Sequence, residues 1–173
     1  MRILGVDPGS RFTGYGCVDK IDGRLSHVTH GTFKLIPLAK KTLLIPMEDR
    51  LFSLYQQISK VIHTLQPQIM VIEKAFFAKN AVSALKLGQV RGALMLIAKM
   101  HDLAMAEYSA TEVKCALAGY GQTNKEQMAH MIQLLVGKQL FQTWDASDGL
   151  ALAIYHAQRM NYDRLLKGRA SGT

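Results

Sequence analysis

The chain has 173 residues, 49% of them hydrophobic and 20% charged, with a formal net charge of +8. This length fits one domain whose hydrophobic core needs no disulfide or structural metal. The balance of apolar and charged residues excludes a disordered chain and an ordinary membrane protein.

Three strand-like segments open the chain. Residues 2–7 form an apolar run that stops at Pro8 and Gly9, and residues 12–19 and 24–36 follow with glycine-bearing turns between them. This pattern predicts an antiparallel meander. Apolar residues then recur at intervals of three and four over residues 47–65, which predicts an amphipathic helix.

Strands and helices alternate in the second half of the chain. Residues 69–73 are apolar until Glu73, as expected of a central strand covered on both faces. A helix is predicted over residues 81–100 and a strand over 103–108. A final helix is predicted from about Asp145 to about Arg159, because an apolar stripe marks one face of that segment.

Two further helix starts are marked by capping boxes. Ser109 is followed by Glu112, and Thr123 by Glu126, at the spacing at which the two side chains cap a helix reciprocally. The full order predicts an α/β fold with a mixed five-stranded sheet, in which three antiparallel strands continue into parallel ones flanked by helices. We expect one domain over residues 1–160 and a basic, flexible tail over 161–173.

The position of the charges indicates a binding partner. Residues 51–100 hold six basic side chains and a single acid, Glu73. Such a surface attracts polyanions, of which nucleic acid is the commonest, although a solvated basic face would look the same. Asp7 and Pro8 interrupt any signal peptide, and Cys17 and Cys115 are far apart in sequence, so we expect a cytoplasmic protein with free thiols.

Four carboxylates stand where a site is expected. Asp7 and Glu73 end predicted strands, and ligands of open α/β sheets bind at the carboxyl ends of the strands. Asp145 and Asp148 are three residues apart and so share one face of the final helix. Clustered carboxylates persist only around a cation, and Mg²⁺ prefers oxygen ligands. Two such ions can activate water and stabilise the leaving oxygen of a phosphodiester.

Each acid also has a structural explanation. Asp7 suits the turn made with Pro8 and Gly9. Asp145 and Asp148 suit a helix cap and a first-turn acid that complements the helix dipole. For Glu73, pairing with a nearby lysine is the main structural alternative.

Four segments of the chain, taken in order, closely resemble the RuvC family of Holliday junction resolvases. They are ILGVDPGSRFTGYG (3–16), VIEKAFFAKNAVSALKLGQVRG (71–92), EVKCALAGYG (112–121) and DASDGLALA (145–153). The resemblance covers nearly the whole chain. It implies a ribonuclease-H-like fold, a homodimer, and Mg²⁺- or Mn²⁺-dependent cleavage of two symmetric strands of a four-way DNA junction. It also implies RuvA and RuvB as partners.

The resemblance assigns roles to individual residues. The catalytic, metal-binding acids of the family match Asp7, Glu73, Asp145 and Asp148. Two further catalytic residues, Lys114 and Lys125, match the lysines of the family, and near a helix start an ammonium can reach a phosphate oxygen in the transition state.

Further residues are predicted to contact DNA. Phe76 matches the functional aromatic of the family, and a ring among cations can stack on bases opened at a junction. For Phe77, a place in the core is an equal alternative. Small residues recur every four positions at Ala84, Gly88 and Gly92, which suits a dimer interface or packing within one subunit. The predicted DNA contacts are Phe76, Lys79, Asn80, Lys86 and Arg91.

Three positions depart from the family pattern. Lys74 stands where Gln or Arg is expected, Trp144 where a small residue usually precedes the first aspartate, and Gly149 where Ala usually follows the last. Glycine there should loosen the first turn of the helix by about 1 kcal/mol relative to alanine. The four acids are intact.

The sequence therefore predicts a Mg²⁺-dependent endonuclease, with two ions per subunit, that resolves Holliday junctions in recombination and repair by paired nicks. It would leave 5′-phosphate and 3′-hydroxyl ends. Alternatives are a ribonuclease-H-like nuclease acting on RNA and a non-catalytic junction-binding module. Segment 7–14 also resembles the phosphate loops of actin- and sugar-kinase-like ATPases, but these need two such domains, and the chain has length for one.

Overall fold

The structure is a computed structural model that describes residues 1–36, 45–74, 80–119, 123–137, 141 and 143–170, with the backbone alone over 161–170. The elements, in chain order, are β1 (Arg2–Asp7), β2 (Phe12–Ile21), β3 (Arg24–Lys34), α1 (Met47–Leu65), β4 (Ile69–Glu73), α2 (Ala81–Met100), β5 (Ala104–Tyr108), α3 (Ala110–Ala118), α4 (Lys125–Val136) and α5 (Trp144–Ala170).

The strands form a mixed sheet in the order β3-β2-β1-β4-β5. β1 pairs antiparallel with β2, and β2 with β3, as the predicted meander requires. β4 joins the other side of β1 in parallel, and β5 pairs in parallel with β4. The predicted mixed five-stranded α/β sheet is confirmed.

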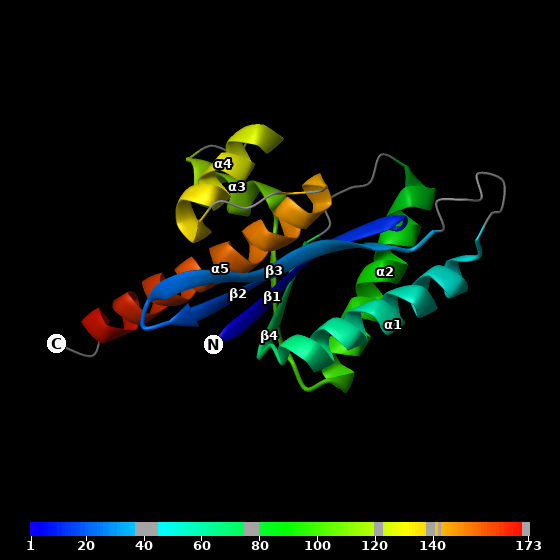
Figure 1. The fold of residues 1–173 in the computed structure, drawn as a ribbon, viewed down its shortest axis with the longest axis horizontal. Coiled ribbons are helices and arrows are strands. Elements are labelled where there is room, and N and C mark those ends of the chain that lie inside the picture. The colour runs from blue at the N-terminus through cyan, green and yellow to red at the C-terminus, as the bar shows by residue number, and fades with distance from the viewer. Residues whose placement is uncertain (37–44, 75–79, 120–122, 138–140, 142, 171–173) are drawn as a thin grey trace.

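Helices cover both faces of the sheet (Figure 1). α5 lies along one face with α3 and α4 beside it, and α1 and α2 pack on the other face. β4 shows the division within one strand, because Ile69 and Val71 join the core under α5 while Met70 and Ile72 join the core under α1 and α2. This confirms that β4 is a central strand buried on both faces.

The predicted cap of α4 is wrong by one residue. The capping box of that helix is made by Asn124 and Gln127, and the Gln127 N–H donates to Asn124 Oδ1 at 2.8 Å. Asparagine caps a helix as well as threonine does, and glutamine can close the box in place of glutamate. Thr123 is buried instead, with 4% of its surface exposed. The box of Ser109 and Glu112 at the start of α3 is confirmed.

α5 is longer than predicted. The helix continues to Ala170 instead of ending near Arg159. The polar composition of the last residues suggested fraying, but no proline interrupts them and most are good helix formers. The division into a domain over 1–160 and a tail over 161–173 stays a prediction.

α2 is apolar for a helix of its length. Among the residues that the structure describes, it alone is long and apolar enough to cross a membrane, with a mean hydropathy of 1.3. One such helix is weak support for a membrane span, because core helices of water-soluble proteins pass the same test. α2 contributes Val90, Leu94 and Ile97 to the core.

Candidate active site

Two of the four acids end neighbouring parallel strands. Asp7 is the last residue of β1 and Glu73 the last of β4. In the strand register, the preceding residues Val6 and Ile72 are partners. Both carboxylates therefore lie at the carboxyl edge of the sheet, where sites of α/β proteins form.

The other two acids lie in the first turns of α5, which sits unusually close to the sheet. A Cβ on Gly14 of β2 would lie 1.8 Å from the backbone oxygen of Asp145, and a Cβ on Gly149 would lie 2.7 Å from the Cα of Tyr15. The helix can pack this close to the sheet only because both positions are glycine. This approach brings Asp145 and Asp148 to the sheet edge that carries Asp7.

The departure at Gly149 thus has a structural reason. By helix propensity alone, this glycine only destabilises the helix. In the structure, Gly149 is buried and faces the backbone of β2, so an alanine methyl group would overlap Tyr15.

A threonine caps the start of α5. The Ala146 N–H donates to Thr143 Oγ1 at 3.3 Å, and Thr143 Oγ1 is also hydrogen-bonded to Thr32 Oγ1 of β3. The structural alternative in which Asp145 caps the helix is therefore excluded, because Thr143 occupies the cap position. Thr143 is not among the predicted residues, although a threonine just before a helix is a recognised capping signal.

The acids act on one another through their charges. Burial raises the pKa of Asp7 well above its ordinary value, and the charges of Glu73, Asp148 and Asp145 raise it further. Burial likewise raises the pKa of Glu73, with a second contribution from Asp148. The pKa of Asp148 is also raised, chiefly by burial. Four negative groups thus share one partly desolvated region, a costly arrangement that a cation would relieve.

The two predicted lysines lie within electrostatic reach of these acids. Lys114 of α3 lowers the pKa values of Glu73 and Asp148 against the larger effect of burial. Lys125, the first residue of α4, acts in the same way on Asp7 and Asp148. The fold thus brings two cations from separate helices close to the acidic edge.

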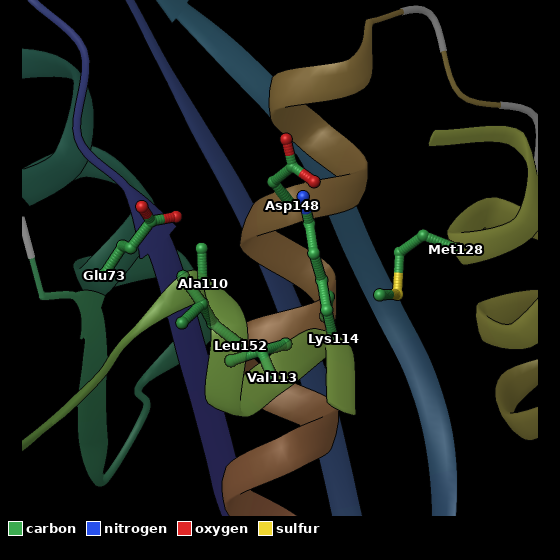
Figure 2. Close-up of a pocket in the computed structure, with 8 residues that line it drawn as sticks. Glu73, Ala110, Val113, Lys114, Met128, Asp148 and Leu152 are labelled. Atoms are coloured by element: carbon green, nitrogen blue, oxygen red, sulfur yellow. The ribbon is translucent and has the colours of Figure 1, made fainter. Parts of the chain in front are cut away.

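Two of the acids and one of the lysines line a single cleft (Figure 2). Glu73 from β4, Lys114 from α3 and Asp148 from α5 line it. Figure 2 shows the Lys114 side chain extending toward the Asp148 carboxylate. The remaining lining residues are apolar: Ala110, Val113, Met128, Ala151 and Leu152.

The acids are not arranged as a preformed metal-binding site in the described residues. Within the described ranges, no three His, Cys, Asp or Glu side chains already converge on one metal position. Carboxylates without a counter-ion repel one another, which opposes their gathering on one point. The group therefore suits a hard divalent cation by its oxygen donors and shared location, and the ligand geometry is not preformed.

The structure describes only three of the predicted DNA contacts, Asn80, Lys86 and Arg91. Asn80 caps α2 by accepting from the Ser83 N–H at 2.9 Å, and Lys86 is exposed on that helix. Arg91 forms a 2.7 Å ion pair with Glu107 of β5, which gives its charge a partner within the protein. Phe76, Phe77 and Lys79 lie outside the described residues. The DNA contacts stay predictions.

Known proteins resemble this chain along nearly its whole length. The family model described as crossover junction endodeoxyribonuclease RuvC matches residues 3–156. The chain belongs to the RuvC family. The RuvC of Syntrophotalea carbinolica is 45% identical over 166 residues, covering 96% of this chain and 99% of that protein. The RuvC of Geobacter sulfurreducens is 43% identical, covering 91% and 92%.

Solved structures agree with this assignment. RuvC of T. thermophilus in complex with a Holliday junction substrate superposes with a TM-score of 0.80 at 28% identity, covering 93% of this chain and 96% of that one. The yeast mitochondrial resolvase Ydc2 shares the fold, with a TM-score of 0.62 at 13% identity over 96% of this chain and 85% of that one. The predicted ribonuclease-H-like fold of the RuvC family is confirmed.

Proposed function

We propose that this protein is a metal-dependent endonuclease that resolves Holliday junctions by paired, symmetric nicks during recombination and DNA repair. The observation that carries the proposal is the meeting of Asp7, Glu73, Asp145 and Asp148 at one sheet edge, in a chain of the RuvC family. The solved relative with a junction substrate supports the same class of DNA.

The donor set fits hard divalent cations. All four groups are carboxylates, and Asp7, Glu73 and Asp148 are each destabilised as anions by burial. We propose two Mg²⁺ ions per subunit, for which Mn²⁺ can substitute, held by Asp7, Glu73, Asp145 and Asp148. Asp7 is the proposed bridging ligand, because its pKa responds to all three other acids. When bound, the ions supply an activated water and stabilise the leaving oxygen.

The lysines complete the proposed catalytic group. Lys114 and Lys125 approach the acids from α3 and α4, so their ammonium groups can hold the scissile phosphate and offset the negative charge that grows during cleavage. Attack of water on phosphorus, with departure of the 3′ oxygen, leaves 5′-phosphate and 3′-hydroxyl ends. Phe76, Lys79, Asn80, Lys86 and Arg91 are the proposed further DNA contacts.

The proposed assembly is a homodimer, because one chain supplies one site and a junction requires two cuts. α2 offers a surface for the second copy. Val82, Leu85 and Leu96 are each more than 60% exposed on this helix, and a Cβ on Gly88 or Gly92 would have no neighbour within 4 Å. Small residues beside exposed apolar ones allow two helices to pack closely. The family resemblance adds RuvA and RuvB as proposed partners and the cytoplasm as the proposed location.

A substrate comparison tests the proposed function. A synthetic four-way DNA junction, a linear duplex with the sequence of one arm, and a structured RNA are each incubated with the protein and Mg²⁺. We expect paired nicks in the junction and little cleavage of the other two. Preferential cleavage of RNA would replace the proposal with an RNA-processing nuclease, and tight junction binding without cleavage would leave a binding module.

A further inference from the structure

Trp144 is the one tryptophan of the chain, and it is the first residue of α5. Its side chain remains 42% exposed, whereas the neighbouring Ala146 and Ser147 are each 1% exposed. The turn around it is firmly held: Thr143 caps it, and Ser147 Oγ donates to the Trp144 backbone oxygen at 2.8 Å. A rigid backbone thus presents a large aromatic side chain to solvent.

The position of Trp144 relative to the acids is fixed by the helix. Asp145 follows it directly, and Asp148 lies four residues on, so Trp144 and Asp148 are neighbours on one helix face. Helical side chains lean toward the helix N-terminus, which places the indole at the outer rim of the acidic site. Among the residues that the structure describes, no aromatic ring or cation is stacked on the indole.

The chemistry of the indole indicates which part of a nucleotide can bind it. The indole carries no charge, so it cannot form an ion pair with a phosphate. Its flat apolar face is suited to a nucleobase, since stacking on an aromatic ring is favourable for every base. A site that cuts a phosphodiester must have nucleotides on both sides of the cut within reach of its rim.

We propose that Trp144 stacks on a nucleobase next to the phosphodiester that is cut. This inference rests on the proposed nuclease function and adds to it a substrate contact that the family resemblance does not supply, because a small residue usually stands at this position. The contact forms in the bound complex before cleavage, so it contributes to substrate binding rather than to the chemical step.

Fluorescence tests the contact directly, because Trp144 is the only tryptophan. The Asp7→Asn variant, which we expect to bind without cutting, is titrated with a four-way junction in Mg²⁺, and binding is followed independently by the anisotropy of a dye on the DNA. We expect the indole emission to be quenched with the same midpoint as the anisotropy, and acrylamide to quench the bound protein less than the free protein. Unchanged emission and acrylamide access at full binding would overturn the inference.

Substitutions test its contribution. Trp144→Ala should raise the KM for junction cleavage, and the Kd in the Asp7→Asn background, by about 5- to 100-fold with little change in kcat. Trp144→Phe should recover most of the affinity. Ile21→Ala is the matched control, because Ile21 is 61% exposed at the opposite end of the sheet, and it should change neither constant.

The outcomes separate this inference from the function on which it rests. If the unsubstituted chain neither binds nor cuts the junction, the proposed function fails and the inference with it. If it binds and cuts but Trp144→Ala behaves like the control, the nuclease function stands and the stacking contact is wrong. A lower kcat at unchanged KM would likewise overturn the contact.

Discussion

Asp7 and Asp19 lie on adjacent strands and respond to the fold in opposite ways. Burial and the neighbouring acids raise the pKa of Asp7, so its ionised form is unfavourable in the metal-free protein. The hydrogen bond from Arg2 lowers the pKa of Asp19, so its ionised form is favourable. Arg2 and Asp19 are joined by two hydrogen bonds, of 2.9 and 2.8 Å.

Asp7→Asn should make the metal-free protein more stable while abolishing cleavage. The raised folded pKa means that stability from this group is highest below the ordinary aspartate pKa of about 4 and is lost as pH rises through the folded value. In EDTA at neutral pH, we therefore expect the melting temperature of Asp7→Asn to exceed that of the unsubstituted protein by about 3 °C or more. The difference should shrink toward pH 4.

Asp19→Asn is the matched control for that measurement. The lowered folded pKa of Asp19 gives stability that is present above the unfolded pKa and lost as pH falls through the folded one. This variant should therefore melt at a lower temperature at neutral pH, with the difference vanishing in acid. A melting temperature of Asp7→Asn at or below that of the unsubstituted protein would contradict the charge repulsion inferred for the site.

The sequence was informative about residues whose chemistry is unusual for their surroundings. Glu73 ends an apolar strand, and Asp145 and Asp148 have helical spacing, so their meeting could be predicted from pattern and resemblance. Thr143 was not predicted as the helix cap, because the aspartates that follow it, Asp145 and Asp148, also suit the start of a helix. The contact of Gly149 with Tyr15 could not be predicted, because it depends on the distance between α5 and the sheet.

At the level of elements, the first two turns of α5 carry Asp145 and Asp148, two of the four proposed catalytic acids, and Thr143 caps the helix. Thr143→Val keeps the shape of the side chain but removes the hydrogen bonds to Ala146 and Thr32. We expect a loss of about 1 kcal/mol in the free energy of unfolding, measured by denaturant titration, and a lower rate of junction cleavage. Thr143→Ser should restore both, and a fully active valine variant would argue against the anchoring role.

Gly149→Ala provides a second test, of how closely α5 packs against β2. Helix propensity alone predicts that alanine stabilises the protein by about 1 kcal/mol. The structure predicts the opposite, because the new methyl group would lie 2.7 Å from the Cα of Tyr15, and overpacking of this kind costs about 1–3 kcal/mol. We expect a lower melting temperature. A more stable alanine variant would mean that α5 lies farther from β2.

Element boundaries were predictable where local signals dominate. The bounds of α1 follow from its apolar periodicity, and the box at the start of α3 follows from its capping residues. The start of α4 lies one residue later than predicted, because two adjacent pairs could form the box. The end of α5 lies beyond the predicted Arg159, because polar residues that favour a helix extend it instead of fraying.

At the level of the whole molecule, two cuts require two sites. Leu85→Glu places a charge on the exposed face of α2, where Leu85 is 66% exposed. We expect this variant to sediment as a monomer and to lose paired cleavage. Leu134→Glu is the matched control, because Leu134 is 67% exposed on α4 and should tolerate the charge. A dimeric Leu85→Glu protein would exclude this face of α2 as the interface.

The most direct test of the nuclease site is cleavage of a synthetic four-way junction in Mg²⁺ by the unsubstituted protein, Asp7→Asn and Asp102→Asn. Asp102 is exposed, with a positive φ of 53° that asparagine adopts readily, and it lies outside the acidic site. We expect symmetric nicks with 5′-phosphate ends from the unsubstituted protein and from Asp102→Asn, and none from Asp7→Asn. Equal nicking by the unsubstituted protein and Asp7→Asn would contradict the assignment of the four carboxylates as the catalytic centre.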